Sequence, residues 1–306
     1  MKDREGRGEN EVHLGMKVMV PGSTGMLGRA VVERLQAENH LPLPCTRADF
    51  DIRDSDSLKR ALDRESPDAL VNCAAYTAVD KAEDEPELAM EINAHAAERM
   101  ARACAERGIR FVHLSTDYVF DGAKGSPYKE DDPPNPLNAY GRSKLESERL
   151  VQKAYPEGFL IFRSSWLFGP GGRSFVSALL TRLENGEMHF RVVNDEVGRP
   201  TYAPDLAVLL VAALEKGLAG IYHACNRGEV SWYDFAQSIF SAAGASSKVR
   251  VDSIPSAEWE TRAVRPAYSV LDTGRLTESL GMDISGYEDA LARYLKTRAG
   301  HSRSAL

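Results

Sequence analysis

Short apolar runs alternate with helical patterns along the first half of the chain. The apolar runs that predict strands span residues 17–21, 41–45, 69–73, 110–114 and 159–164. Apolar residues at helical spacing between them predict one helix ending near 38 and others over 56–64, 86–107 and 137–154. This alternation is typical of a parallel sheet with helices on both faces. The predicted fold class is therefore α/β, a Rossmann-type doubly wound parallel sheet.

The alternation loosens after about residue 166. Helices are predicted over 175–185, 204–216 and 231–243, and strands over 188–193 and 221–224. No internal repeat or low-complexity linker separates this half from the first. We therefore expect a Rossmann domain over 16–166 and a smaller C-terminal α/β lobe over 167–306, some segments of which return to the first domain. Residues 1–15 are polar and charged, which predicts a disordered N-terminal extension rather than a secretory signal.

Composition narrows the possible partners. The 306 residues are 43% hydrophobic, enough for a sizeable core without disulfides or metals. A formal net charge of -7 argues against general nucleic-acid or anionic-membrane binding. No apolar run reaches the ~18 residues of a membrane span. The four scattered cysteines form no CxxC pair, which indicates reduced thiols in a cytoplasmic protein: Cys45, Cys73, Cys104 and Cys225.

A glycine-rich turn follows the first strand and opens the first helix. Its glycines are Gly22, Gly25 and Gly28. This spacing suits a tight turn, a close approach of the backbone to a pyrophosphate, and close packing of helix on strand. The diphosphate would lie on free N–H groups at the helix N-terminus. The turn thus predicts an NAD(P)-binding first domain, with an ordinary glycine-rich turn as the alternative.

The end of the second strand bears on the choice of cofactor. An acidic residue there would hydrogen-bond the adenosine ribose and favour NAD. This chain instead has Cys45, Thr46 and Arg47. Arg47 could accommodate a 2′-phosphate, so NADPH is the expected cofactor, with NADH as the alternative. An exposed arginine without this role is the other interpretation.

Tyr140 and Lys144 form the second chemical pattern. Their spacing of four residues puts both side chains on one face of a helix. Hydride delivery to a ketone leaves an alkoxide that needs a proton, and a neighbouring ammonium is expected to lower the pKa of a phenol. Thr116 follows the fourth strand, whose carboxyl end faces the ligand crevice in such sheets. We therefore predict a catalytic set of Tyr140, Lys144 and Thr116, rather than an exposed helical pair.

These patterns together resemble the extended short-chain dehydrogenases, and more closely the dTDP-4-dehydrorhamnose reductases. The resemblance covers almost all of the chain from Met16 to about residue 280. The stretches that carry it are 22–28, 72–83, 115–122, 136–144, 163–166, 198–201, 231–236 and 265–266.

The resemblance implies roles for the matching positions. Tyr140 would be the proton donor that completes reduction of the C4 keto group of dTDP-4-dehydro-L-rhamnose to dTDP-L-rhamnose. The implied cofactor contacts are Gly25, Met26 and Leu27 on the diphosphate, Asp51 and Ile52 by the adenine, and Ala75, Tyr76 and Thr77 in the cofactor cleft. The implied sugar contacts are Thr116, Asp117 and Trp166. An aromatic face can stack on a sugar ring, although a tryptophan buried in the core or between lobes is the alternative for Trp166.

Some alternatives remain open at this point. The related dehydratases carry Thr-Asp-Glu, whereas this chain has Thr116, Asp117 and Tyr118 and so lacks the second acid that elimination uses. A reductase of other stereochemistry fits the same motifs. So does a non-catalytic regulatory subunit like that of methionine adenosyltransferase. Some members of the family that the chain resembles bind Mg²⁺ through glutamates at a subunit contact. Those glutamates cannot be matched in this sequence, so no metal is assigned. A homodimer is expected only from the resemblance.

Overall fold

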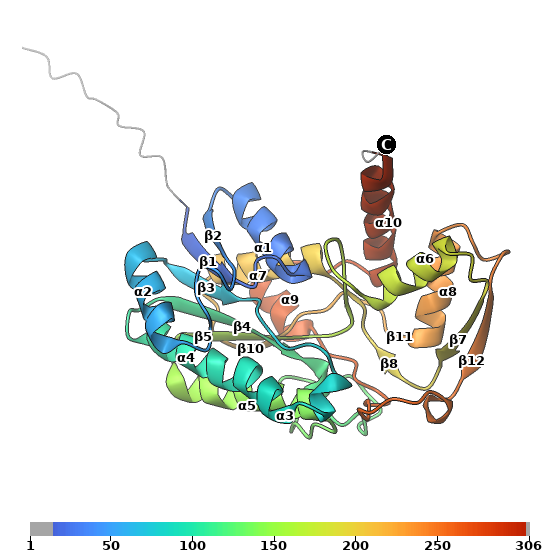
Figure 1. Cartoon of the computed structure of the whole chain (residues 1–306), viewed down its shortest axis with the longest axis horizontal. Coiled ribbons are helices and arrows are strands. Elements are labelled where there is room, and N and C mark those ends of the chain that lie inside the picture. Colours follow the sequence, from blue (N-terminus) through green and yellow to red (C-terminus); the bar gives the residue numbers. More distant parts are fainter. Residues whose placement is uncertain (1–14, 304–306) are drawn as a thin grey trace, which may run out of the picture.

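The computed structural model describes residues 15–303, with side chains placed as far as residue 299. The predicted extension over 1–15 lies, apart from Gly15, outside the described residues. The chain forms a larger part built on one sheet and a smaller part beside it (Figure 1).

The larger part contains six parallel strands in the order β10-β5-β4-β3-β1-β2. The strands are β1 (Lys17–Pro21), β2 (Leu41–Cys45), β3 (Ala69–Asn72), β4 (Arg110–Thr116), β5 (Phe159–Ser164) and β10 (Gly220–His223). Val18, Met19 and Val20 are all buried although they alternate between the two faces of the sheet. Such a strand must be covered on both sides, which explains its unbroken apolar run. The predicted α/β class is confirmed.

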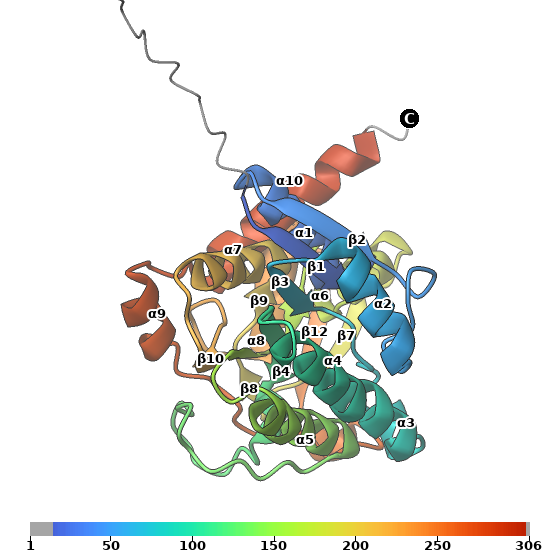
Figure 2. The same cartoon turned by 90° about the vertical axis from the view of Figure 1, so that its left-hand side faces the viewer.

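Helices cover both faces of this sheet (Figure 2). One face packs on α1 (Met26–Ala37), α7 (Ala203–Glu215) and α9 (Gly274–Leu280). The other face packs on α2 (Ser55–Glu65), α4 (Ala96–Ala105) and α5 (Ala139–Ala154). The chain returns to the sheet after leaving it, because α7 packs against α1 and β10 pairs with β5.

Capping residues set the helix boundaries. Asp54 caps α2 by accepting hydrogen bonds from the N–H groups of Asp56 and Ser57. The helix predicted over 137–154 begins only at Ala139, because the Asn138 side chain accepts a hydrogen bond from the Gly141 N–H.

The helix predicted over 86–107 consists of three consecutive segments. They are α3 (Pro86–Met90), a π-helical turn (Glu91–His95) and α4. The last segment ends before Gly108, whose φ of +65° lies in the left-handed region where glycine is favoured. Gly108 therefore favours the end of the helix at this point.

The smaller part has its own aromatic core, which includes Phe168, Phe190, Phe235 and Phe240. Its main elements are α6 (Phe175–Glu184), α8 (Trp232–Ala242), α10 (Tyr287–Arg303) and the strand pair β7 (His189–Val193) with β12 (Arg250–Ile254). Shorter pieces complete the chain: β6 (Leu167–Phe168), β8 (Val197–Gly198), β9 (Thr201–Tyr202), β11 (Val230–Ser231) and 3-10 turns at Lys81–Glu83, Asp117–Val119 and Ser256–Glu258. The elements β12, α9 and α10 were not predicted from the sequence.

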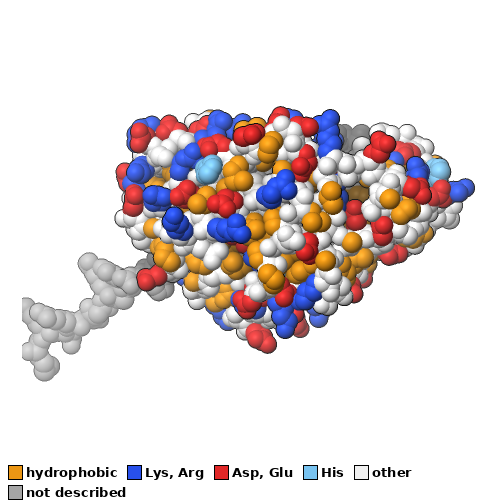
Figure 3. All heavy atoms as spheres, turned by 90° about the horizontal axis from the view of Figure 1, so that it is seen from below, with side chains coloured by type: hydrophobic (Ala, Val, Ile, Leu, Met, Phe, Trp, Pro, Cys, Tyr) orange, Lys and Arg blue, Asp and Glu red, His pale blue; other side chains and the backbone are white. Residues whose placement is uncertain are grey.

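The surface is polar and of mixed charge. Figure 3 shows one face, on which acidic and basic side chains intermingle with hydrophobic ones rather than gathering into a basic surface. Within residues 15–303, no helix is both long and apolar enough to span a membrane. In the same range, no group of three or more histidine, cysteine or acidic side chains is placed to hold a metal ion.

Candidate active site

A cleft of about 590 Å³ lies at the carboxyl ends of the central strands. This edge is where ligands bind in open α/β sheets. The predicted site residues that line it are Gly25, Met26, Leu27, Ala75, Thr77, Thr116, Asp117, Tyr140, Lys144 and Trp166. The predicted residues that do not line it are Gly22, Gly28, Arg47, Asp51, Ile52 and Tyr76.

The glycine turn has the shape that a diphosphate site needs. Gly22 has a φ of +77°, and a Cβ there would lie 2.6 Å from the Ala74 nitrogen. A Cβ on Gly28 would lie 2.2 Å from the Gly22 carbonyl oxygen. These two glycines therefore shape the turn without lining the cleft. Gly25 is the N-cap of α1 and provides no side-chain hydrogen bond, so the N-terminal N–H groups of α1 have no capping side chain. The residues present fit the diphosphate of a dinucleotide.

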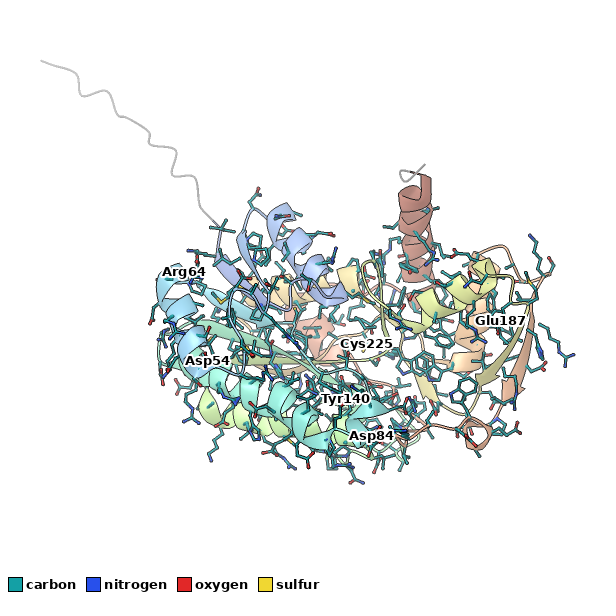
Figure 4. The ribbon with its side chains drawn as sticks, in the orientation of Figure 1. Asp54, Arg64, Asp84, Tyr140, Glu187 and Cys225 are labelled. Atoms are coloured by element: carbon teal, nitrogen blue, oxygen red, sulfur yellow. The ribbon has the colours of Figure 1, made fainter. Side chains whose placement is uncertain are left out.

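Local contacts fix the position of Tyr140 at the start of α5, where the two parts of the molecule meet (Figure 4). The Ala139 N–H donates to the Glu83 carboxylate over 2.6 Å, so Glu83 and the Asn138 cap together hold the first turn of α5. The Tyr140 ring packs edge-on to Tyr118, with 6.1 Å between ring centroids. Thr116 at the end of β4 accepts a hydrogen bond from the Tyr118 N–H and donates to Asp117 over 3.0 Å.

The electrostatics of the Tyr140 and Lys144 pair differ from the expectation. Burial raises the pKa of Tyr140 to about 12, and a hydrogen bond between the Tyr140 and Thr116 hydroxyls opposes this rise. Burial also lowers the pKa of Lys144 to about 8, opposed by the Glu148 charge. The predicted lowering of the phenol pKa was wrong, because the cost of burying a phenolate exceeds the effect of its neighbours. The environment instead keeps Tyr140 protonated, which suits a proton donor.

Asp117 links the two parts of the molecule beside the cleft. Its carboxylate accepts hydrogen bonds from Thr116 and from the Ser269 hydroxyl, at 3.0 and 2.5 Å. Burial raises the pKa of Asp117 to about 7, although both hydroxyls oppose the shift. The Asp117 carboxyl group holds the Thr116 hydroxyl in a fixed orientation.

Trp166 both lines the cleft and packs on the smaller part. Its indole stacks on that of Trp232, with 3.4 Å between centroids and 6° between planes. Its φ of +46° is unusual for a bulky residue. A Cβ on Gly198 would lie 2.5 Å from the Trp166 ring, so the glycine leaves room for the indole. Trp232 in turn donates its indole N–H to Glu196 over 3.1 Å. One face of Trp166 is thus covered by protein, and its contact with sugar stays a prediction.

The residues predicted near the adenine end lie outside the cleft. Arg47 is exposed in the turn after β2, two residues beyond Cys45. The Cys45 carbonyl accepts hydrogen bonds from the Ser23 N–H and hydroxyl, so this turn lies beside the glycine turn. Asp51 pairs with Arg53 through contacts of 2.6 to 3.2 Å.

The remaining predicted residue outside the cleft, Tyr76, belongs to a hydrogen-bonded loop. Its hydroxyl donates to Glu85 over 2.8 Å. Its backbone N–H and carbonyl are both bonded to the Asn93 side chain, at 2.8 and 3.0 Å. Asn93 also donates to the Ser143 hydroxyl on α5 over 2.9 Å. The loop of Tyr76 is therefore tied to α5, although Tyr76 itself does not line the cleft.

A buried ion pair behind Lys144 was not predicted from the sequence. Arg163 on β5 makes two bonds to Glu148 on α5, at 2.9 and 2.7 Å, and the two side chains are only 3% and 1% exposed. Ser115 also donates to Glu148. The charged pair is satisfied on several sides, as buried charges require. The sequence offered one indication of this ion pair, because Glu148 follows Lys144 by four residues and so lies on the same face of the helix.

A second set of buried polar side chains is hydrogen-bonded to the backbone of Lys144. Asn72 and His113 contact each other at 3.2 Å, and the far nitrogen of His113 lies 2.9 Å from the Ser147 hydroxyl. Ser147 donates to the Lys144 carbonyl over 2.6 Å. Burial lowers the pKa of His113, so the ring is neutral and serves as a rigid link. No local sequence pattern marks these residues, because the contact depends on strand register.

The fold and the cleft define a class of protein. The sheet is parallel, with a glycine turn at the start of α1 and a tyrosine and a lysine one helical turn apart at its carboxyl edge. This is the arrangement of NAD(P)-dependent short-chain oxidoreductases of the extended type. Residues 16–299 match the family model described as the RmlD substrate binding domain. The chain belongs to this family, that of the dTDP-4-dehydrorhamnose reductases, as the sequence predicted.

Several relatives support the assignment. A dTDP-4-dehydrorhamnose reductase of Streptomyces griseus is 41% identical over 262 residues, which is 84% of this chain and 86% of that one. A dTDP-4-keto-6-deoxy-D-glucose reductase of Streptomyces niveus is 40% identical over 253 residues, 83% of this chain and 87% of that one. A crystal structure of dTDP-4-dehydrorhamnose reductase from Bacillus anthracis in complex with NADP aligns with a TM-score of 0.88 at 35% identity, covering 92% of this chain and 99% of that one.

Proposed function

We propose that this protein reduces the C4 keto group of dTDP-4-dehydro-L-rhamnose with NADPH, giving dTDP-L-rhamnose and NADP⁺. The observation that carries the proposal is the cleft itself. It brings Tyr140, Lys144 and Thr116 together with the N-terminus of α1, in a chain 41% identical to a dTDP-4-dehydrorhamnose reductase.

The residues around the cleft are suited to hold the cofactor. NADPH, when bound, supplies the hydride. The N-terminal turn of α1 at Met26 and Leu27 would hold its diphosphate, because free N–H groups and the helix dipole favour an anion there. Lys144 would bind the nicotinamide ribose through its ammonium group. Arg47, exposed beside the glycine turn, would pair with the 2′-phosphate.

The protein's own part in the reaction is proton delivery. The substrate carbonyl becomes an alkoxide as it accepts the hydride, and the Tyr140 hydroxyl donates its proton to that oxygen. A pKa of about 12 keeps this phenol protonated at neutral pH. The ammonium of Lys144, one helical turn further along α5, would stabilise the phenolate that forms. The Thr116 hydroxyl would orient the carbonyl oxygen beside Tyr140.

Two features favour reduction over the elimination chemistry of related enzymes. Tyr118 stands where the dehydratases carry a second acid, and its ring packs against Tyr140 instead of offering a carboxyl group. Asp117 bonds to Thr116 and Ser269, which ties it to orientation of the site. Together with Trp166, these residues would contact the sugar.

A reductase of other product stereochemistry is the second candidate. The Streptomyces niveus relative, 40% identical, is named for a different dTDP-4-keto sugar. The product sugar depends on which face of the ring meets the nicotinamide. The two candidates therefore share every catalytic residue and differ only in how the ring is oriented in the cleft.

The setting of the reaction forms part of the proposal. The four cysteines are all free, which fits a reducing compartment such as the cytoplasm. A homodimer stays a prediction from the resemblance.

Purified protein tests the proposed reaction directly. NADPH oxidation is followed by absorbance after adding dTDP-4-dehydro-L-rhamnose, and the product is identified by NMR. We expect oxidation that depends on the ketosugar and a product with rhamnose stereochemistry. A different C4 epimer would support the second candidate, while absence of ketosugar-dependent oxidation would refute both.

A further inference from the structure

A glycine-rich loop from the smaller part packs on the start of α1. It spans residues 169–174 between β6 and α6. A Cβ on Gly172 would lie 2.8 Å from the Met26 side chain, and one on Gly171 would lie 2.9 Å from the Arg29 side chain. A Cβ at either position would require the Met26 or Arg29 side chain to shift, so the two glycines let the loop backbone lie close to the first turns of α1. The loop is therefore held beside the place where we put the cofactor diphosphate.

Arg173 is the next residue in this loop and lines the cleft with Gly25 and Met26. Among the described residues, its exposed side chain has no ion pair and no side-chain hydrogen bond. Arginines in the adjoining segments are occupied: Arg182 pairs with Glu187, and Arg29 donates to the Thr24 carbonyl. An arginine that lines the cleft and has no acidic partner among the described residues is available for a ligand.

The charged residues that line the cleft indicate which kind of ligand it can bind. Its charged lining residues are Lys144, Asp117 and Arg173. Lys144 is buried beside Tyr140, and Asp117 is committed to two hydroxyls. The proposed reaction brings two diphosphates to this cleft, one in the cofactor and one in the nucleotide sugar. The N-terminus of α1 can take one of these anions, which leaves Arg173 as the cation at the rim that can neutralise diphosphate charge.

We propose that Arg173 is a diphosphate-binding residue of this site. The guanidinium group offers a planar fork of donors that matches two phosphate oxygens, which makes arginine well suited to this task. The inference rests on the proposed function for the identity of the two ligands.

The test compares Arg173→Ala and Arg173→Lys with the unchanged protein. Arg60→Ala is the matched control. Arg60 is also exposed and has no side-chain partner in the part of the chain that the structure describes, but it lies on α2 outside the cleft lining. Calorimetry measures binding of NADPH and of thymidine diphosphate separately. Loss of a charged hydrogen bond to phosphate is expected to weaken binding about ten-fold or more. Arg173→Lys should lose less than Arg173→Ala, and Arg60→Ala should bind as before.

The outcomes separate the two diphosphates. Weaker binding of NADPH alone assigns Arg173 to the cofactor, and weaker binding of thymidine diphosphate alone assigns it to the nucleotide sugar. Unchanged affinity for both ligands in Arg173→Ala overturns the inference, even if turnover falls. These binding measurements do not depend on catalysis. If the unchanged protein binds both ligands but does not reduce the ketosugar, the proposed function fails while the role of Arg173 is still decided.

Discussion

Replacing Lys144 with methionine should stabilise the protein while it removes activity. Lys144 is 2% exposed, and burial lowers its pKa from 10.5 to about 8. The difference of roughly 2.5 units, at 1.36 kcal/mol each, means that folding the protonated lysine costs about 3 kcal/mol below pH 8. Methionine has a similar length without the charge. Glu148 keeps its partner Arg163, so the substitution leaves no buried charge unpaired.

The sign of the pH dependence follows from proton binding. Between pH 8 and 10.5 the unfolded chain binds a proton at Lys144 that the folded protein has released. Stability from this group therefore rises with pH across that window, and the cost of burying Lys144 disappears above it. The advantage of Lys144→Met should be about 3 kcal/mol at pH 7 and close to zero above pH 10.5.

Equilibrium urea unfolding of both proteins at several pH values checks this reasoning, since the difference between them cancels the titration of other groups. Turnover of NADPH with the ketosugar is measured on the same samples. The reasoning is refuted if Lys144→Met is no more stable than the unchanged protein at pH 7, or if its advantage is the same at both ends of the pH window.

Two further substitutions test the glycine turn and the tryptophan stack beside the cleft. Gly28→Ala introduces a Cβ 2.2 Å from a carbonyl oxygen of the glycine turn, so it should cost ~1–3 kcal/mol of stability. It should also weaken NADPH binding. Calorimetry that shows undiminished affinity for NADPH would contradict the role of the turn. Trp232→Leu removes the stack on Trp166, worth ~0.5–1.5 kcal/mol beyond its buried area, and should raise the KM for the ketosugar while leaving that for NADPH unchanged. Trp232→Phe should restore much of the loss, whereas equal KM values in all three proteins would show that the stack does not position Trp166.

The regular elements of the larger part could be predicted because their patterns are local. The strand at 17–21 is apolar at every position that the sheet buries, and Asp54 and Gly108 mark helix ends through their own side-chain or backbone preferences. The strand Arg250–Ile254 was missed because its alternation includes arginine, aspartate and serine, and it pairs with a distant segment of the chain.

The candidate site shows the same division between local and long-range information. The spacing of Tyr140 and Lys144 is readable along one helix. The stack of Trp166 on Trp232 brings together residues far apart in sequence, and no spacing rule reports it. The direction of the Tyr140 pKa shift was mispredicted for a related reason: burial depends on what surrounds the ring in three dimensions, whereas the sequence shows only its neighbour on the helix.

The central claim is that the Tyr140 hydroxyl gives its proton to the reduced carbonyl. The most direct measurement is the rate of NADPH oxidation with dTDP-4-dehydro-L-rhamnose by Tyr140→Phe, beside calorimetric binding of NADPH to the same variant. We expect the rate to fall by ~10²–10⁴ while NADPH still binds. A phenylalanine variant that reduces the ketosugar at the unchanged protein's rate would contradict the account.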